Sequence, residues 1–342
     1  MQDQKNKAEQ RVPTLSSQEL MIMEVVMSEK KIIAVVGATG AQGGGLVRAI
    51  LADPNGPFSV RAITRDPDSD AAKALAAAGA QVVKADIDDE ASLTYALQGA
   101  YGAFFVTFFW AHFSPEIEQK EAQIMAAAAK TTGIKHAIWS TLEDTRISIP
   151  LSDNRMPTLQ GKYKVAHFDG KAEANHFFTD AGVPTTFLQT TFYWENMIYF
   201  GMGPKRGEDG KLSITFPMGD KRLSGIAAED IGACAYGIFK GGNAYIGKTV
   251  SIAGENITCA NMASELSEVL GEVVTYNAVT PDMYRSFGFP GADDLGNMFQ
   301  FYADFEEDFC NIRDINKVRK LHPGLKSFKQ WLNANKDRIP LS

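Results

Sequence analysis

Ser140, His167 and Lys171 carry side chains that can take part in proton transfer. Ser140 ends the apolar run Ile138-Trp-Ser140, and the segment from Tyr163 to Lys171 is predicted as helix. His167 and Lys171 are four residues apart and therefore share one helix face. A neutral imidazole can donate a proton near pH 7, which makes His167 a candidate proton donor. A partly buried histidine with satisfied hydrogen bonds fits the same sequence equally well.

A glycine-rich turn near residue 40 is the second chemical feature. Gly37, Gly40 and Gly43 follow an apolar run at 31–36 that is typical of a buried parallel strand. Such glycines let the backbone approach a pyrophosphate, and the next helix offers free N–H groups at its N-terminus. The spacing Gly-x-x-Gly-x-x-Gly departs from the usual Gly-x-Gly-x-x-Gly, and a purely structural turn is the alternative. We predict a dinucleotide site contacted by Gly37, Thr39, Gly40, Ala41, Gln42 and Gly43.

Arg65 bears on which dinucleotide binds. It stands at the end of the predicted strand 59–64, where an NAD-selective site usually has an acidic residue for the ribose 2′-hydroxyl. A guanidinium instead offers a bidentate fork to a 2′-phosphate. Asp66 follows directly, so a carboxylate is displaced by one position, and a plain surface arginine is the alternative. We predict NADP(H) in preference to NAD(H).

Polar residues also end the next two predicted strands. Asp86 can accept from an adenine amino group, and Lys84 is close enough in sequence to reach the 2′-phosphate. Asp88 and Asp89 are better explained as the cap and first turn of the following helix. Thr107 ends the strand predicted at 102–107, beside the expected path of the dinucleotide.

The elements that carry these residues alternate between strand and helix from residue 31 to about 190. Such alternation predicts a Rossmann-type α/β fold, a doubly wound parallel sheet with helices on both faces. The predicted strands are 31–36, 59–64, 80–85, 102–107, 136–140 and 185–189, and the predicted helices are 43–52, 70–78, 89–98, 116–132 and 165–181.

Beyond residue 190 the alternation loosens. A loop is predicted at 201–210, strands at 247–252 and 272–278, and helices near 227–240, 258–270, 281–287, 293–308 and 327–336. We expect residues 30–190 to form the dinucleotide-binding part. We expect residues 191–342 to form a smaller α+β part that packs on the same fold and closes the cleft, so that the two make a single domain. Residues 1–29 are expected to be a disordered extension.

Composition narrows the class of protein. The net charge is −7 and the pI about 5.4, which gives no general attraction for nucleic acids or anionic membranes. No apolar stretch approaches the roughly 20 residues that span a bilayer. Cys234, Cys259 and Cys310 lie far apart, which favours buried thiols over a disulfide frame or a metal site.

The order of the chemical residues resembles the short-chain dehydrogenase superfamily, in which a strand-end serine precedes a Tyr-x-x-x-Lys pair on the next helix. Here His167 occupies the tyrosine position. The segment His167-Phe-Asp-Gly-Lys171 closely resembles NmrA-like proteins, which are atypical members of that superfamily. Segments 190–196, 287–292 and 295–302 also match, and the resemblance covers roughly residues 30–336. It is stronger to the human-type redox-sensor group than to the fungal nitrogen repressor.

This resemblance implies an NADP(H)-binding redox sensor that changes its protein partner, or its association with a second copy, as the cofactor binds. It places Lys171 on the nicotinamide ribose and Thr190 and Tyr193 along the nicotinamide. Glu195 and Asn196 follow and could reach the cleft, although Asn196 is as well suited to brace the loop. The alternative is an NADPH-dependent reductase of a quinone or small carbonyl compound that uses His167, Lys171 and Ser140. A cytoplasmic location is expected in both cases.

Overall fold

The computed structural model describes residues 30–341, and the predicted N-terminal extension lies outside that range. A seven-stranded sheet in which every neighbouring pair of strands is parallel forms its centre. The strands in spatial order are β3 (Gln81–Lys84), β2 (Phe58–Thr64), β1 (Lys31–Val35), β4 (Gly102–Phe105), β5 (His136–Thr141), β6 (Thr185–Gln189) and β11 (Thr249–Ser251). The chain order reverses between β1 and β4, where open α/β sheets bind their ligands.

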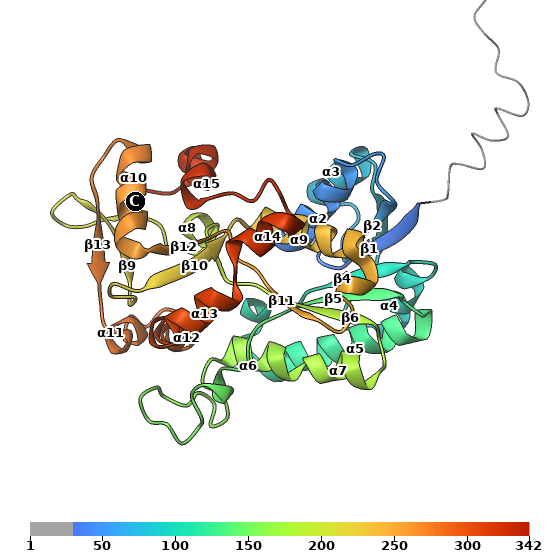
Figure 1. The fold of residues 1–342 in the computed structure, drawn as a ribbon, viewed down its shortest axis with the longest axis horizontal. Helices are drawn as coiled ribbons and strands as arrows, with labels where there is room; N and C mark the ends of the chain where they lie inside the picture. Colours follow the sequence, from blue (N-terminus) through green and yellow to red (C-terminus); the bar gives the residue numbers. More distant parts are fainter. Residues whose placement is uncertain (1–29, 342) are drawn as a thin grey trace, which may run out of the picture.

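Helices cover both faces of this sheet (Figure 1). One face packs against α2 (Ala41–Leu51), α3 (Asp70–Ala77), α9 (Ala228–Gly241) and α14 (Ile315–Leu321). The other packs against α4 (Glu90–Leu97), α5 (Pro115–Thr132) and α7 (Asn175–Asp180), and α6 (Ala166–Glu173) continues that layer. The predicted α/β class with a doubly wound parallel sheet is confirmed.

The predicted helix 165–181 differs from the structure in two respects. It is divided at Ala174 into α6 and α7, and Tyr163 lies in a turn before α6, where it pairs with Leu159. Tyr163 was predicted to lie on the same helix as His167 and Lys171. The backbone N–H groups of Lys164 and Val165 instead bond to the side chain of Asp169, which starts the helix one residue later.

The remainder of the chain builds a second layer of structure beside the large sheet (Figure 1). One small sheet has the order β13 (Val274–Ala278), β9 (Leu212–Phe216), β8 (Lys205–Arg206), and another has the order β12 (Glu255–Thr258), β10 (Arg222–Ile226), β7 (Phe192–Tyr193). Their helices are α8 (Asn196–Tyr199), α10 (Cys259–Leu270), α11 (Pro281–Arg285), α12 (Ala292–Asp304), α13 (Glu306–Ile312) and α15 (Phe328–Asn335). Trp194, Phe216, Phe299 and Trp331 are buried in its separate core.

This second part also completes the first. It supplies β11 at the edge of the large sheet and α9 and α14 on one face. Helices α2 and α9 touch at two glycines, since a Cβ on Gly232 would lie 2.0 Å from the Leu46 nitrogen and one on Gly45 would lie 2.5 Å from the Glu229 oxygen. The helix that follows the glycine turn therefore rests on a helix of the C-terminal part. Across residues 30–341, no helix is both long and apolar enough to cross a membrane.

Candidate functional site

The glycine turn between β1 and α2 has the features that a pyrophosphate requires. Gly37 has φ +65°, a conformation that favours glycine, and a Cβ on Gly43 would lie 2.4 Å from the Gly37 oxygen. The first N–H of α2 that is hydrogen-bonded belongs to Gly44, so those of residues 41–43 have no partner within the described chain. No acidic residue occupies the first turn of α2. Free N–H groups and the positive helix end together suit an anion.

Arg65 and Lys84 lie side by side at the ends of β2 and β3. Lys84 pairs in register with Thr64, the residue before Arg65, and both cationic side chains are exposed. The carboxylate of Asp66 accepts the N–H of Asp68 and is held in its own turn. The two residues predicted to contact a 2′-phosphate are therefore neighbours at one end of the sheet.

The acidic residues after β3 divide between the two roles predicted for them. Asp89 caps α4 by accepting from the N–H groups of Ala91 and Ser92, as expected. Asp86 is half-buried, and its Oδ1 accepts the N–H of Asp88. The second carboxylate oxygen of Asp86 makes no hydrogen bond with the described residues, so it remains available to an adenine amino group.

Lys171 belongs to a buried cluster beneath the end of β4. Its Nζ donates to Thr107 Oγ1 and to Glu118 Oε1, both at 2.6 Å, and Thr107 Oγ1 itself donates to Glu118 at 2.7 Å. Glu118 lies on α5 and is fully buried. The structure therefore joins two predicted residues, Lys171 and Thr107, through a carboxylate that sequence reasoning missed. A signal existed, because Glu118 occupies the same face of α5 as the buried Ala122, Met125 and Ala129.

A second carboxylate and a histidine extend this cluster. Glu121 is one turn further along α5, and burial raises its pKa to about 7, with further increases from the charges of Glu118 and Asp88 and opposite effects from Lys171 and Arg65. His112 Nδ1 accepts the N–H of Ser114, so in the neutral ring the proton is on Nε2, which lies 3.9 Å from Glu121 Oε1. Among the described residues, His112 Nε2, Glu118 Oε2 and Glu121 Oε2 are buried without hydrogen-bond partners.

His167 forms a dyad with Asp294. Nδ1 of the buried imidazole bonds to Asp294 Oδ2, and the other oxygen of that carboxylate accepts the N–H of Ala166. The imidazole ring lies 5.0 Å from the ring of Trp110 and 5.7 Å from that of Phe109, measured between centroids. Nε2 makes no hydrogen bond with any described residue. Asp294 lies on α12, 127 residues away in sequence, and no local pattern in the sequence indicated it.

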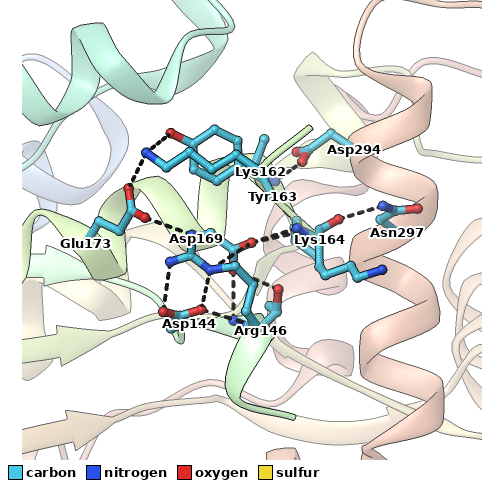
Figure 2. Close-up of polar contacts among 12 residues, drawn as sticks. Asp144, Arg146, Lys162, Tyr163, Lys164, Asp169, Glu173, Asp294 and Asn297 are labelled. Carbon is cyan, nitrogen blue, oxygen red and sulfur yellow. Dashed lines mark hydrogen bonds and ion pairs between the residues drawn. The ribbon is translucent and has the colours of Figure 1, made fainter. Parts of the chain in front are cut away.

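The carboxylates of Asp169 and Asp294 hold the start of α6 from two sides (Figure 2). Asp169 is buried and accepts the N–H groups of Lys164, Val165 and Thr145. A Cβ on Gly170 would lie 2.8 Å from Pro115, so this glycine permits the close approach of α5. Within this motif, His167 and Lys171 therefore face the site, whereas Asp169 and Gly170 position the helix.

Side chains of α12 hold the segment before α6 by bonding to the backbone carbonyl groups of that segment. Asn297 Nδ2 donates to the carbonyl oxygen of Lys164 (Figure 2) and to that of Pro157. Gln300 Nε2 donates to the carbonyl oxygen of Arg155. Asp294 reaches α6 from the same helix. The C-terminal part thus positions both His167 and the chain that leads to it.

Ser140 belongs to a different network. Its Oγ donates to Gln42 Oε1 at 2.7 Å, Gln42 Nε2 donates to the hydroxyl of Tyr193 at 2.7 Å, and that hydroxyl lies 3.2 Å from Thr190 Oγ1. Burial raises the pKa of Tyr193 to about 12. Four predicted residues therefore meet at the first turn of α2. No hydrogen bond in the described structure joins Ser140 to His167 or Lys171.

Glu195 does not face the cleft. Its carboxylate accepts from the Ala228 N–H and from Trp331 Nε1, both at 2.8 Å, so it joins α9 to α15. Asn196 begins α8, and its backbone carbonyl accepts from Phe200 and Met202. In residues 30–341 no group of three or more His, Cys, Asp or Glu residues could hold a metal ion.

This chain is similar to known proteins in sequence and in fold. The model of the NmrA-like family matches residues 29–332. The NmrA-like family domain-containing oxidoreductase FrzB of Cladobotryum sp is 31% identical over 283 residues, which is 79% of this chain and 83% of the relative.

Two solved structures show the same fold with a dinucleotide present. The structure of NmrA, a negative transcriptional regulator, in complex with NADP has a TM-score of 0.71 and 23% identity, covering 90% of this chain and 95% of that chain. The NADPH-dependent quinone oxidoreductase QOR2 of Escherichia coli, complexed with NADPH, has a TM-score of 0.67 and 24% identity, covering 88% and 99%.

Proposed function

Because this chain belongs to the NmrA-like family, we propose that it is an NADP(H)-dependent reductase of a carbonyl compound such as a quinone. The observation that carries this proposal is the dyad of His167 and Asp294, one helical turn from Lys171 on α6. A histidine held by a carboxylate at Nδ1 presents Nε2 in a defined orientation. His167 stands where the Tyr-x-x-x-Lys pattern has its tyrosine, so that position holds a side chain that can transfer a proton.

The residues present fit the cofactor. The free N–H groups at the start of α2 suit the pyrophosphate, Arg65 and Lys84 suit the 2′-phosphate, and Lys171 with Thr107 suits the nicotinamide ribose. When bound, the reduced nicotinamide supplies a hydride. Oxidoreductases among the relatives, including one named for NADPH-dependent quinone reduction, support this assignment.

His167 completes the reduction by moving one proton. When a hydride is transferred to the carbonyl carbon, the imidazole of His167 would give its Nε2 proton to the carbonyl oxygen, so that one hydroxyl forms. Asp294 would stabilise the positive charge on the ring before transfer, and it accepts the hydrogen bond of the Nδ1–H, whose proton stays on the imidazole throughout. Ser140, which is bonded to Gln42, holds the first turn of α2 in this scheme.

The test is NADPH oxidation with a panel of quinones and aldehydes. We expect turnover above the background rate, and we expect His167→Ala to lower it at least tenfold with little change in NADPH affinity, since general acid catalysis contributes about 10²–10⁴-fold. His176→Ala, at an exposed histidine on α7, is the matched control. Absence of turnover across the panel, or full activity in His167→Ala, would reject the proposal.

The second candidate is a redox sensor, active through cofactor-dependent binding of a partner protein or of a second copy in the cytoplasm. The favouring observation is that the ammonium of the partly exposed Lys171 is already bonded to the buried side chains of Glu118 and Thr107. NmrA, whose fold this chain shares, is described as a transcriptional regulator. A change in association state between NADPH and NADP⁺, measured by light scattering in a protein without turnover, would favour the sensor.

A further inference from the structure

Aromatic side chains extend outward from the imidazole of His167. The ring of Trp110 lies 5.0 Å from that of His167, and the ring of Phe113 lies 5.8 Å from that of Trp110. Trp110 is half-buried, whereas Phe113 is 40% exposed. The surface that begins at the dyad therefore continues to solvent as an aromatic wall.

A second segment packs against this wall from the C-terminal part. A Cβ on Gly291 would lie 2.8 Å from the ring of Trp110 and 3.2 Å from that of Phe113, so the turn before α12 touches both. The same turn carries Phe287 and Phe289, which are 46% and 38% exposed. We call Trp110, Phe113, Phe287 and Phe289 the aromatic rim.

The backbone at Phe113 is unusual. Its φ is +56°, and Gln160 is the other residue in the described range that is not glycine and has positive φ. Such a conformation costs on the order of 1–3 kcal/mol and is found mostly at functional sites. A hydrogen bond from the Phe113 N–H to the Phe109 oxygen, at 2.8 Å, and ring contacts with Phe109 and Trp110 maintain it. The chain thus holds a large apolar ring partly in water.

We propose that the aromatic rim is the substrate-binding surface, and that the substrate is a flat carbonyl compound with two or more fused aromatic rings. The proposal rests on the reductase function and names its substrate class. Aromatic rings attract one another in offset or edge-to-face arrangements. Trp110 and Phe113 present such rings beside the dyad, and Phe287 and Phe289, which pack against Tyr284, are carried by the turn that touches them. A single-ring or aliphatic carbonyl compound at the dyad would leave the outer rings of the rim in water.

The reaction on such a substrate is balanced. A quinone of this class takes one hydride at a carbonyl carbon and one proton at the oxygen from His167 Nε2, which gives the hydroquinone after enolisation. NADPH is oxidised to NADP⁺, and solvent returns the proton to the imidazole.

The experiment compares a three-ring with a one-ring substrate. We expect Phe289→Ala, and separately Phe113→Gly, to raise the KM for 9,10-phenanthrenequinone at least tenfold. The KM for 1,4-benzoquinone and both kcat values should change less than twofold. Glycine is chosen at position 113 because it accepts positive φ. Tyr95→Ala, at a 70% exposed aromatic side chain on α4, is the matched control.

Binding without turnover separates this proposal from the reductase function. Equilibrium dialysis of phenanthrenequinone is run with NADP⁺, which cannot supply a hydride. Binding by the native chain and its loss in the rim variants, without activity, would support the rim and reject the reductase. Unchanged KM values and unchanged binding in folded variants would overturn the rim. Conversion of a dimer to a monomer in the variants, with quinone binding intact, would also overturn it and assign the surface to a second copy.

Discussion

Lys171 has less freedom than a surface lysine. An ammonium has three N–H donors, and two of them are directed at Glu118 and Thr107. The third lies 3.4 Å from the Thr107 carbonyl oxygen, a long contact that a ribose hydroxyl would replace. Because removal of one partner from a buried ion pair costs about 3–5 kcal/mol, Lys171→Ala would report on folding as much as on cofactor binding.

A substitution at Arg65 tests cofactor binding more directly than one at Lys171, because the Arg65 side chain is exposed. We expect Arg65→Ala to weaken NADPH binding about tenfold to a hundredfold, since a charge-assisted hydrogen bond contributes about 1.5–3 kcal/mol. NADH affinity should barely change. Fluorescence titration with both cofactors measures this, with Lys73→Ala on α3 as an exposed control. Equal weakening toward both cofactors would show that Arg65 does not contact the 2′-phosphate.

Glu121 should make stability depend on pH. Its folded pKa, raised by burial to about 7, exceeds the unfolded value of 4.5, so the folded state binds the proton more tightly. Stability is therefore lost as pH rises from about 4.5 through 7. We expect Glu121→Gln to match the native chain at pH 4.5 and to exceed it by about 1–3 kcal/mol at pH 8.

Urea unfolding at the two pH values measures this difference. Glu90→Gln, at an exposed carboxylate on α4, should show no such dependence. A Glu121→Gln effect of the same size at both pH values would mean that the carboxylate does not titrate in this range.

Single residues were predictable where their chemistry depends on a local motif. The glycine turn, Arg65 and Lys171 stand at strand ends or on one helix face, and short-range spacing places them. Asp294 and Glu118 were not predictable in the same way. Asp294 lies in the C-terminal part and bonds to His167 in the first part. The role of Glu118 depends on the packing of α5 against the end of β4, where Glu118 bonds to Thr107.

At the scale of elements, the regular alternation of strand and helix patterns made the first half of the chain predictable. The six strands predicted before residue 190 are all present, because buried parallel strands are short apolar runs between turn residues. The strands β7, β8, β9, β10 and β12 and the helices α8 and α14 were missed, and β8 lies within the predicted loop 201–210. Leu212, Ile214 and Phe216 do alternate with polar residues, but the surrounding glycine-rich sequence obscured that signal. Amphipathic pieces this short are decided by tertiary packing.

The contact of α2 with α9 makes a prediction at this scale. Gly232→Val should destabilise the protein by about 2–3 kcal/mol, because the side chain would overlap the backbone of Gly45 and Leu46. It should also weaken NADPH binding, since α2 carries the pyrophosphate site. Thermal melting and NADPH titration test both effects, with Ala233→Val as the neighbouring control. Native stability in Gly232→Val would mean that α9 moves away at no cost.

At the scale of the whole molecule, the two parts share structural elements. The second part lends β11, α9 and α14 to the large sheet, and α12 holds α6. We therefore expect one cooperative unfolding transition in calorimetry, with equal calorimetric and van't Hoff enthalpies. Two separated transitions would show that the parts fold independently.

The hydrogen bonds from α12 to residues 155–164 have a consequence for how the sequence of this protein can evolve. Asn297 and Gln300 bind carbonyl oxygens that every amino acid possesses, and most side chains from 157 to 162 are exposed. Gln160 and Gly161, with φ of +50° and +70°, and the buried Lys164 fix the shape of this segment, whereas the side chains of Pro157 and Thr158 are exposed. A library randomised at positions 157 and 158 would keep the backbone contacts with α12 while changing the surface before α6, so new specificity can evolve there at little cost to the fold.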